Sequence, residues 1–409
     1  MTEKQQKALD KMKAHGQQDA LRFWEELTEE NRERFAEQIL KTDFAGLTSY
    51  DAGSIGHQGV IRPIRALTVD EIRAREDELL NIGLSSLKAG EAAAVLLAGG
   101  MGTRLGSDGP KGVYDIGLTK PVYIFQRLIE NLMDVVKLSG VTPDLYIMTS
   151  EKNDQVTRDF LKEHSFFGYD AAHVFFFEQE SAPAVDYEGQ ILLEEKDRLA
   201  TSPNGNGGWY RSLLHSEAGA HFKASGTKWL NVFAVDNVLQ RILDPVFLGA
   251  TIEAGVNSGS KVIRKNAPDE GVGVLCLEDD HPTVIEYYEL TDELKEAKDE
   301  NGDPAYNFGV ILNYLFKIEE LNRVVDISLP FHRVEKKIPC LDEKGEKLSP
   351  DKPNGHKFEL LVLDLVSAMH TCLPYEVVRE KEFAPIKNKT GKDSVESARA
   401  LLQQNGITL

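Results

Sequence analysis

Apolar residues in the middle of the chain form short runs that alternate with stretches of amphipathic spacing. A short apolar run bounded by polar and turn residues is typical of a buried strand. Four such runs are Glu91 to Leu97, Leu145 to Thr149, His173 to Phe177 and Trp229 to Val235. Helical spacing separates them, as from Val122 to Leu138. This alternation predicts an α/β fold with a doubly wound, mostly parallel central sheet.

The regions on either side of these runs show different patterns. Apolar side chains at near-helical spacing from Asp19 to Leu40 predict a helical N-terminal region over residues 1–90. Residues 91–330 form the predicted main domain. Residues 331–409 form a predicted C-terminal region, which includes a helix from Phe358 to Met369. A chain of 409 residues is long enough for such a multipart organisation.

The second half of the main domain has a mixed pattern that predicts a pocket wall of strands or hairpins. Its strand-like runs are Gly271 to Leu277, Thr283 to Leu290 and Asn307 to Phe316. Two charged, turn-rich stretches, Thr291 to Pro304 and Leu341 to Gly355, are predicted to be solvated loops.

Composition and charge narrow the classes of partner. Apolar residues make up 41% of the chain and the net charge is −19. A strongly acidic protein without a concentrated basic patch is repelled by nucleic acids and anionic membranes. The N-terminus lacks an apolar targeting segment, and no apolar run approaches the roughly 20 residues of a membrane span, so we predict a cytosolic protein. Cys276, Cys340 and Cys372 lie far apart and are predicted to be buried, reduced thiols.

A glycine-rich turn follows the first predicted strand, in the sequence LLAGGMGTRLGSDGPKG. Gly99, Gly100 and Gly102 carry no Cβ that would hold a phosphate away from the backbone amides, and Arg104 and Lys111 add cationic donors. The ends of parallel strands are where such folds bind ligands. The turn therefore predicts a phosphate site.

Spacing tests two familiar alternatives for this turn. A dinucleotide fingerprint starting at Gly100 needs a third glycine where this chain has Leu105. A P-loop needs a serine or threonine after Lys111, where this chain has Gly112. Both fail, which leaves G-x-G-T-R followed by P-K, a pattern that resembles the signature of sugar-nucleotide pyrophosphorylases.

At these residues the chain resembles the eukaryotic-type UDP-N-acetylhexosamine pyrophosphorylases and their UDP-sugar pyrophosphorylase relatives, whose loop reads LAGG-x-GTRLG followed by PKG. The resemblance continues through further blocks along nearly the whole chain: GQQDALRFWEEL, FFEQESAPA, SPNGNGGWYRSL, VDN, KKIP, KPNGHK and YEVVREKEFAPIKN. It implies a Rossmann-like sheet of the nucleotidyltransferase type, with the C-terminal region contributing to the active site. It also implies a uridylyltransferase that joins UTP to a sugar 1-phosphate and releases pyrophosphate, with Mg²⁺ as cofactor.

The resemblance assigns roles residue by residue. The catalytic cations are Arg104, Lys111 and Lys387. The nucleotide-binding residues are Leu97, Ala98, Gly99, Gly100, Gly102, Thr103, Gln179 and Gly205, of which the last two contact the uracil. A side-chain amide such as that of Gln179 offers donors and an acceptor for the uracil edge, and glycines let the backbone approach the ring.

Asp236 ends the run NVFAVD and matches the aspartate of the family's VDN block. The resemblance makes it the ligand of a Mg²⁺ ion beside the α-phosphate, and a carboxylate at a strand end suits that ion. Asp236 and Asn237 also fit a helix N-cap before VLQRIL, and both interpretations are kept.

For the sugar, the resemblance points to Asn206, Gly273, Glu286 and Asn307, because a carboxylate and amides can bind several hydroxyls. One position departs from the family. The family's FNAGNI reads YNFGVI here, so an asparagine that helps to hold an N-acetylhexosamine is Val310. Leu361 and Leu363 also replace two phenylalanines. We expect N-acetylglucosamine 1-phosphate as the substrate, with glucose or galactose 1-phosphate as the alternative.

Two other classes of function are weighed against this one. An NAD-dependent oxidoreductase would need the missing third glycine. A binding module that senses a UDP-sugar without turnover would not need both Lys111 and Asp236. The sequence predicts no nucleic-acid or membrane partner, and it gives no oligomeric state.

Overall fold

The computed structural model describes residues 1–48, 59–325 and 329–409, which form two compact units built from separated segments. The smaller unit comprises Met1–Gly56, Gln179–Trp209 and Ser328–Val362. The larger unit comprises His57–Glu178, Tyr210–Ile327 and Leu363–Leu409. These units cut across the three consecutive regions expected from the sequence, and that division stays a prediction.

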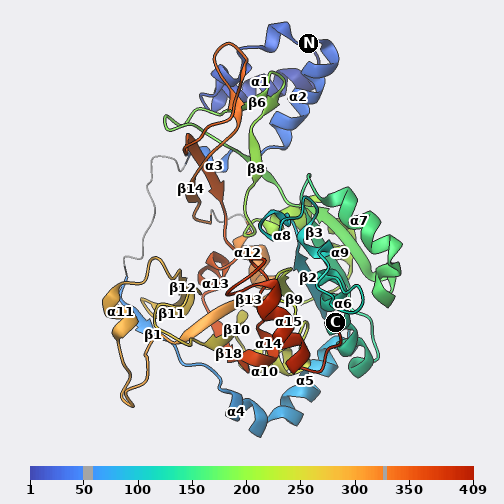
Figure 1. Cartoon of the computed structure of the whole chain (residues 1–409), viewed down its shortest axis with the longest axis vertical. Helices are drawn as coiled ribbons and strands as arrows, with labels where there is room; N and C mark the ends of the chain where they lie inside the picture. The colour runs from blue at the N-terminus through green and yellow to red at the C-terminus, as the bar shows by residue number, and fades with distance from the viewer. Residues whose placement is uncertain (49–58, 326–328) are drawn as a thin grey trace. The chain divides into compact units, whose positions relative to one another are not determined.

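The larger unit is built on one mixed sheet, in which the described residues supply ten strands (Figure 1). The strands are β1 (Ile61–Pro63), β2 (Ala92–Leu97), β3 (Leu145–Thr149), β4 (Val174–Glu178), β9 (Trp229–Ala234), β10 (Ser258–Arg264), β11 (Val274–Glu278), β12 (His281–Ile285), β13 (Phe308–Lys317) and β18 (Cys372–Glu376). Its helices are α4 (Val69–Ala74), α5 (Glu76–Lys88), α6 (Ile124–Ser139), α7 (Asp154–Glu163), α8 (Trp209–His215, its first residue from the smaller unit), α9 (Glu217–Ala224), α10 (Pro245–Glu253), α11 (Asp292–Glu296), α12 (Ile318–Val324), α13 (Asp364–Ala368), α14 (Arg379–Glu382) and α15 (Val395–Gln404).

The strand order is β1-β11-β13-β9-β2-β3-β4, with β10 beside β13 and β18, and β12 beside β11. The neighbours β9, β2, β3 and β4 are all parallel, and they are the four strands predicted from the apolar runs. The other pairs are antiparallel except that of β10 with β18. The predicted α/β class is therefore confirmed, with antiparallel strands added beside the parallel core.

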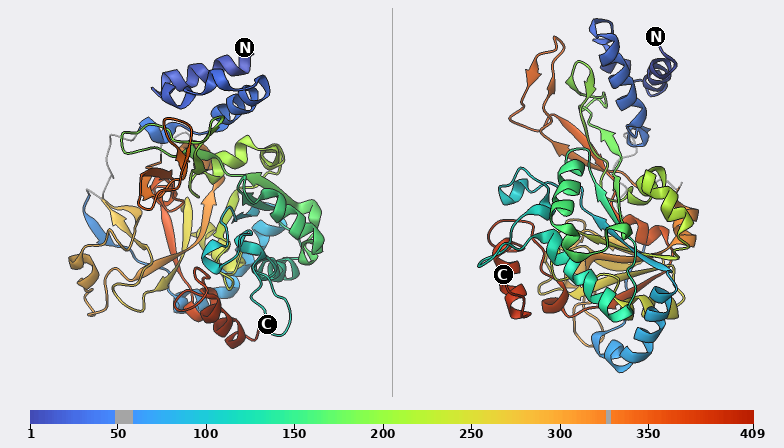
Figure 2. Two further views of the ribbon diagram at one scale, coloured as in Figure 1. Left: turned by 45° about the horizontal axis from the view of Figure 1, so that its top comes forward. Right: turned by 90° about the vertical axis from the view of Figure 1, so that its right-hand side faces the viewer.

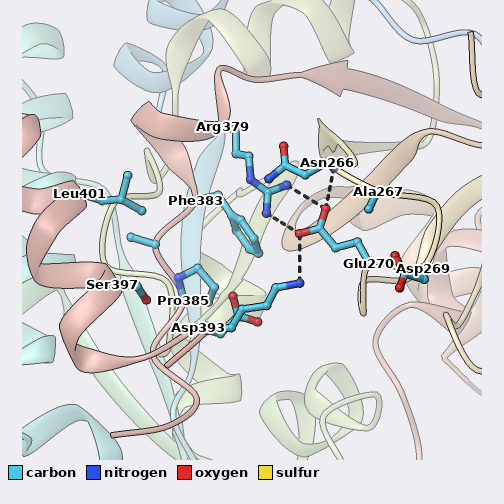
Figure 3. Close-up of a pocket in the computed structure, with 12 residues that line it drawn as sticks. Asn266, Ala267, Asp269, Glu270, Arg379, Phe383, Pro385, Asp393, Ser397 and Leu401 are labelled. Carbon is cyan, nitrogen blue, oxygen red and sulfur yellow. Dashed lines mark hydrogen bonds and ion pairs between the residues drawn. The ribbon is translucent and has the colours of Figure 1, made fainter. Parts of the chain in front are cut away.

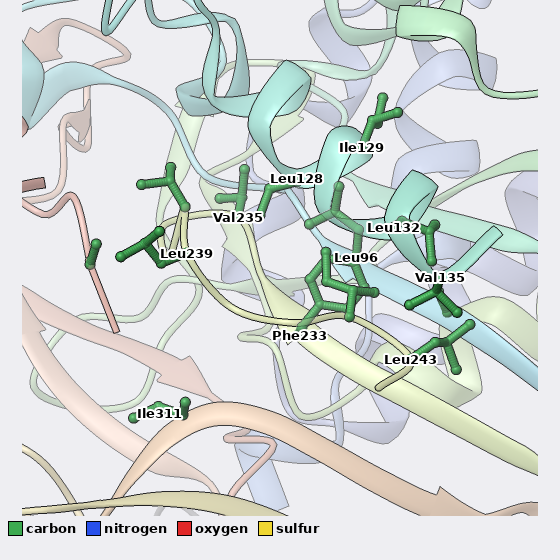
Figure 4. Packing of buried hydrophobic residues seen from close by; sticks show 14 of the residues in the cluster. Leu96, Leu128, Ile129, Leu132, Val135, Phe233, Val235, Leu239, Leu243 and Ile311 are labelled. Atoms are coloured by element: carbon green, nitrogen blue, oxygen red, sulfur yellow. The ribbon is translucent and has the colours of Figure 1, made fainter. Parts of the chain in front are cut away.

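Helices cover both faces of the parallel strands (Figure 2). Successive side chains of a strand point to opposite faces of the sheet, so each strand contributes to two apolar layers. Leu96 of β2 and Phe233 of β9 belong to one apolar cluster with Leu128 and Leu132 of α6 (Figure 4). On the other face, the ring of Tyr146 in β3 packs against Phe222 of α9 at 5.6 Å between centroids. This double coverage explains why the strands read as continuous apolar runs.

The smaller unit pairs helices with short hairpins. Its helices are α1 (Glu3–Ala14), α2 (Glu29–Lys41) and α3 (Ala45–Thr48), and its strands are β5 (Ser181–Pro183), β6 (Leu193–Glu195), β7 (Arg198–Leu199), β8 (Thr201–Pro203), β14 (His332–Lys336), β15 (Cys340–Leu341), β16 (Lys347–Leu348) and β17 (Gly355–Glu359). Helices α1 and α2 lie side by side (Figure 2). Met12 and Phe35 from these helices share an apolar cluster with Leu199 and Phe358.

The near-helical run from Asp19 to Leu40 does not begin with an α-helix. Two 3₁₀ turns precede α2, which starts where the Thr28 side chain accepts a hydrogen bond from the Asn31 backbone amide. A threonine cap of this kind sets a helix start. Phe358 does not begin a helix either, because it pairs with Arg333 in the β14–β17 hairpin, and the helix α13 starts only at Asp364.

The prediction that the three cysteines are buried, reduced thiols is confirmed in part. All three are free thiols, and Cys276 and Cys340 are buried, whereas Cys372 is partly exposed.

The two charged stretches predicted to be loops also contain regular secondary structure. The helix α11 lies in the stretch from Thr291 to Pro304, and the strand β16 lies in the stretch from Leu341 to Gly355. No helix within the described ranges combines the length and apolarity that a membrane crossing requires. The cytosolic location remains a prediction.

Candidate active site

The glycine turn after β2 is held by two polar side chains that follow β3. Asn153 donates its side-chain N–H to the carbonyls of Ala98, at 3.0 Å, and Gly100, at 3.4 Å. The Ser150 hydroxyl donates to the Gly99 carbonyl at 3.0 Å. These bonds occupy carbonyl oxygens, whereas the amides of Gly99 and Gly100 donate to no other described residue. Amides left available in a glycine turn are suited to binding an anion.

The chain after this turn folds back on it. The Gly102 amide donates to the Gly109 carbonyl at 2.8 Å, and the Lys111 amide donates to the Gly100 carbonyl at 3.1 Å. Gly112 has to lack a side chain, because a Cβ there would lie 2.2 Å from the Phe125 ring. The predicted loop residues are thereby gathered at one strand end: Leu97, Ala98, Gly99, Gly100, Gly102, Thr103, Arg104 and Lys111.

Asp236 lies beside this loop because β2 and β9 are parallel neighbours. Leu97 pairs with Ala234, so Gly99 and Asp236 both come two residues after that paired position. The Lys111 ammonium lies 3.9 Å from the Asp236 carboxylate, and these side chains are 17% and 24% exposed. A half-buried ion pair at a strand end can bind both a phosphate and a cation.

The charges around Lys111 favour an anion at this place. Burial lowers the pKa of Lys111, and although Asp236 raises it, the neighbouring cations Lys387 and Arg104 lower it further. Three cations held near one carboxylate repel one another, and a bound polyphosphate would relieve that repulsion.

The C-terminal segment reaches this site through Asn237. Its side chain donates to the Glu382 carbonyl at 2.7 Å and accepts from the Ala384 amide at 2.9 Å. The Ile386 amide donates to the Asp236 carbonyl at 2.9 Å, so Lys387 comes directly after a residue bonded to Asp236. The N-cap interpretation of these residues is wrong, because α10 starts only at Pro245 and Asn237 binds the C-terminal segment instead.

The sugar candidates of the larger unit also lie close to one another. In the antiparallel β11–β12 pair, Val274 pairs with Ile285, which places Gly273 opposite Glu286. The Val310 amide donates to the Gly273 carbonyl at 2.9 Å, so Val310 and the nearby Asn307 join this group. Because β13 is antiparallel to β9, its first residues lie at the edge where β9 ends.

The oxygen of one predicted sugar ligand is partly used within the protein. The Asn307 side-chain oxygen accepts a hydrogen bond from the Lys265 backbone amide at 3.0 Å, which leaves one lone pair of that oxygen and the NH₂ group for sugar hydroxyls.

The remaining candidates, Gln179, Gly205 and Asn206, belong to the smaller unit. The structure thus does not bring them together with the others within one compact unit. A different reason for glycine also appears: Gly205 has a φ of +88°, and a Cβ there would lie 2.3 Å from the Leu360 carbonyl. The Asn206 side-chain oxygen accepts from the Val362 amide at 2.9 Å.

Sequence reasoning missed the side chains that position the site. Ser150, Asn153 and Asn237 were assigned no role in the site, and their signal was only that each follows the end of a parallel strand. Within the described residues, no group of three or more His, Cys, Asp and Glu side chains gathers as a metal cage.

An α/β sheet with an amide-rich glycine loop, a strand-end carboxylate and nearby cations is suited to the chemistry of a nucleotidyltransferase. A sequence model of the family described as UTP–glucose-1-phosphate uridylyltransferase matches residues 60–408. The chain belongs to this family, and it is a uridylyltransferase.

Individual relatives agree. The chain is 36% identical to human UDP-N-acetylhexosamine pyrophosphorylase-like protein 1, across 95% of this chain and 82% of that protein. It is 39% identical to the UDP-N-acetylglucosamine pyrophosphorylase of Saccharomyces cerevisiae, across 80% and 71% of the two chains. A crystal structure of the Trypanosoma brucei UDP-N-acetylglucosamine pyrophosphorylase with an inhibitor is similar with a TM-score of 0.84 at 26% identity, across 99% and 85% of the chains. The resemblance seen in the sequence is confirmed.

Proposed function

We propose that the protein makes UDP-N-acetylglucosamine and pyrophosphate from UTP and N-acetylglucosamine 1-phosphate, with Mg²⁺ as cofactor. The observation that carries the proposal is the convergence of the Gly99–Gly100 amides, Lys111, Arg104 and Lys387 around Asp236. The names of the relatives favour an N-acetylated sugar. The family description names glucose 1-phosphate, and Val310 removes a polar group expected near an acetamide, so glucose 1-phosphate is the second candidate.

In the proposed reaction an oxygen of the sugar phosphate attacks the α-phosphorus of UTP in line, and the bond to the bridging oxygen of pyrophosphate breaks. The attacking oxygen is already anionic near neutral pH, so no general base is required. The barrier comes from bringing two polyanions together and from charge gathering on pyrophosphate. Lys111, Arg104, Lys387 and the loop amides would offset that charge and hold the reactants in line.

The donor set at Asp236 fits a magnesium ion. Mg²⁺ is commonly held by one or two carboxylates together with substrate phosphates, and Asp236 supplies one carboxylate beside the phosphate loop. When bound, the ion would supply further positive charge at the α-phosphate.

Incubating the protein with Mg²⁺, UTP or another nucleoside triphosphate, and a panel of sugar 1-phosphates tests the function. The panel contains the 1-phosphates of N-acetylglucosamine, glucose and galactose. We expect UDP-N-acetylglucosamine to form fastest, with one pyrophosphate released per product. Separation of the nucleotide sugars by chromatography measures the preference. The proposal is wrong if no sugar in the panel yields a nucleotide sugar, and a faster reaction with glucose 1-phosphate would assign the second candidate.

Val310→Asn tests whether residue 310 contacts the acetamide group of the sugar. We expect the ratio of kcat/KM for N-acetylglucosamine 1-phosphate to that for glucose 1-phosphate to rise about 3- to 10-fold, the effect of one added neutral hydrogen bond. Val310→Ala is the matched control, because it removes bulk without adding a donor. An unchanged ratio in Val310→Asn, or an equal rise in both variants, would show that residue 310 does not read the acetamide through a hydrogen bond.

A further inference from the structure

The larger unit contains a cavity of about 340 Å³ beside the segment that carries Lys387. Its wall combines residues 266–270, which follow β10, with residues from both sides of Lys387 (Figure 3). Glu270 points from the first group toward Arg379, and dashed lines in Figure 3 mark its bonds. The cavity therefore lies between the segment that follows β10 and the C-terminal segment that carries Lys387.

The Glu270 side chain is buried and its carboxylate has several partners. The residue is 4% exposed. Arg379 donates to both carboxylate oxygens, at 2.5 and 3.2 Å, and the Asn266 amide donates to one of them at 2.9 Å. The Lys392 ammonium lies 3.6 Å from the other. A bidentate arginine pair with an added amide bond fixes both side chains in one geometry.

The two cationic partners of Glu270 lie on either side of Lys387 in the chain. Arg379 starts α14 and also donates to the Arg264 carbonyl at 3.3 Å. Beyond Lys387, the amides of Lys387 and Asn388 both donate to the Asp393 carbonyl, at 2.7 and 3.0 Å, which closes the turn that includes Lys392. Glu270 thus contacts the chain before and after Lys387.

Glu270 also adjoins the predicted sugar wall. Its carbonyl accepts a hydrogen bond from the Val272 amide at 2.8 Å, and the next residue is Gly273. Although burial raises the pKa of Glu270, the bonds from Arg379 and the Asn266 amide outweigh it and hold the pKa below its usual range. The carboxylate is therefore ionised at neutral pH, as its two cationic partners require.

We propose that Glu270 is a positioning residue, which binds Arg379 and Lys392 on the two sides of Lys387 and so fixes the Lys387 side chain for the reaction. This inference rests on the proposed role of Lys387 at the phosphates. The Glu270 carboxylate is engaged by Arg379, Lys392 and the Asn266 backbone amide, so in this proposal it acts through the segment that it holds.

Glu270→Gln removes the charge and keeps the shape, and Asp269→Asn is the matched control, because it removes one exposed charge from the neighbouring residue. We expect Glu270→Gln to lower kcat about 10- to 100-fold, as a small misplacement of a catalytic group does, with KM for UTP near that of the parent protein. Asp269→Asn should keep the parent kcat. Steady-state kinetics on the full chain give both values.

The same change in a Lys387→Met background separates positioning from general damage. If Glu270 acts through Lys387, the double variant is as slow as Lys387→Met alone. An equal loss from Glu270→Gln in both backgrounds would overturn the inference, and so would parent-like kcat in Glu270→Gln while Lys387→Met is impaired. Parent-like kcat in Lys387→Met would instead remove the role of Lys387 on which the inference rests.

A second variant keeps the test open if Glu270→Gln does not fold. The Lys392 side chain is 66% exposed, so Lys392→Ala should leave the fold intact. We expect a several-fold lower kcat that disappears in the Lys387→Met background. Parent-like kcat in Lys392→Ala, or an equal loss in both backgrounds, would contradict the inference.

Discussion

Lys111→Ala is expected to lower turnover by about 100-fold or more, while the fold persists. The Lys111 side chain adjoins the glycine loop, 3.9 Å from the Asp236 carboxylate and near two further cations. In the proposed reaction it would offset charge on the phosphates as the leaving group departs. A donor that acts mainly in the transition state lowers kcat more than it raises KM. We expect Asp236→Ala to cause a loss of similar size.

Steady-state rates of UDP-sugar formation measure this effect, with circular dichroism to verify the fold. Lys120→Ala is the matched control, because Lys120 is an exposed lysine on the chain after the loop. The control should retain parent turnover. Turnover near that of the parent protein in Lys111→Ala would exclude Lys111 from the mechanism, and the same result for Asp236→Ala would exclude Asp236.

Lys261→Met is expected to cost about 3–5 kcal/mol of unfolding free energy, the usual loss when one partner of a buried ion pair is removed. The Lys261 ammonium is fully buried, at 2.5 Å from the Glu382 carboxylate and 3.2 Å from that of Asp244. Burial alone would raise the pKa of Asp244, but Lys261 and Arg241 hold it below its ordinary value. Removing Lys261 takes the nearest cation from two buried carboxylates and leaves only Arg241 beside them.

Urea unfolding of the full chain, followed by circular dichroism, measures the loss. Lys228→Met is the control, because Lys228 is 63% exposed and pairs with Glu91 at the surface, where such pairs contribute at most about 1 kcal/mol. Folding lowers the pKa of Asp244, so its ionised carboxylate adds to the free energy of unfolding at any pH above its pKa in the unfolded chain. This stabilisation is lost as the pH falls through its pKa in the folded protein. A loss in Lys261→Met no larger than the loss of at most about 1 kcal/mol expected for Lys228→Met would contradict the prediction.

The parallel strands of the sheet could be predicted because a buried strand is recognised from a short run of apolar residues. The strands β2, β3 and β9 are buried on both faces and consist mostly of apolar residues. Together with the partly buried edge strand β4, they lie within one residue of the predicted bounds. Phe358 is equally apolar, but its pairing with Arg333 depends on a segment distant in sequence, so helical spacing was misleading there.

The candidate site divides in the same way. The loop from Gly99 to Lys111 could be predicted, because missing Cβ atoms and fixed cations are properties of the residues themselves. Asn237 could not be assigned, because its side chain fits a helix cap as well as a bond to a chain segment about 145 residues away. The partners of Glu270 could not be predicted either, because Arg379 and Lys392 lie far from it in the sequence.

The sequence by itself determined the α/β class, the glycine-rich loop and the family, because the spacing of apolar residues, the spacing of glycines and the sequence motifs can all be read from neighbouring residues. Only the tertiary structure decided that Asp236 and Lys111 form a pair, that Asn237 and Glu270 hold the Lys387 segment, and that Val310 lies beside Gly273. Those arrangements depend on strand order and register, which are set by packing and hydrogen bonds between segments far apart in the chain.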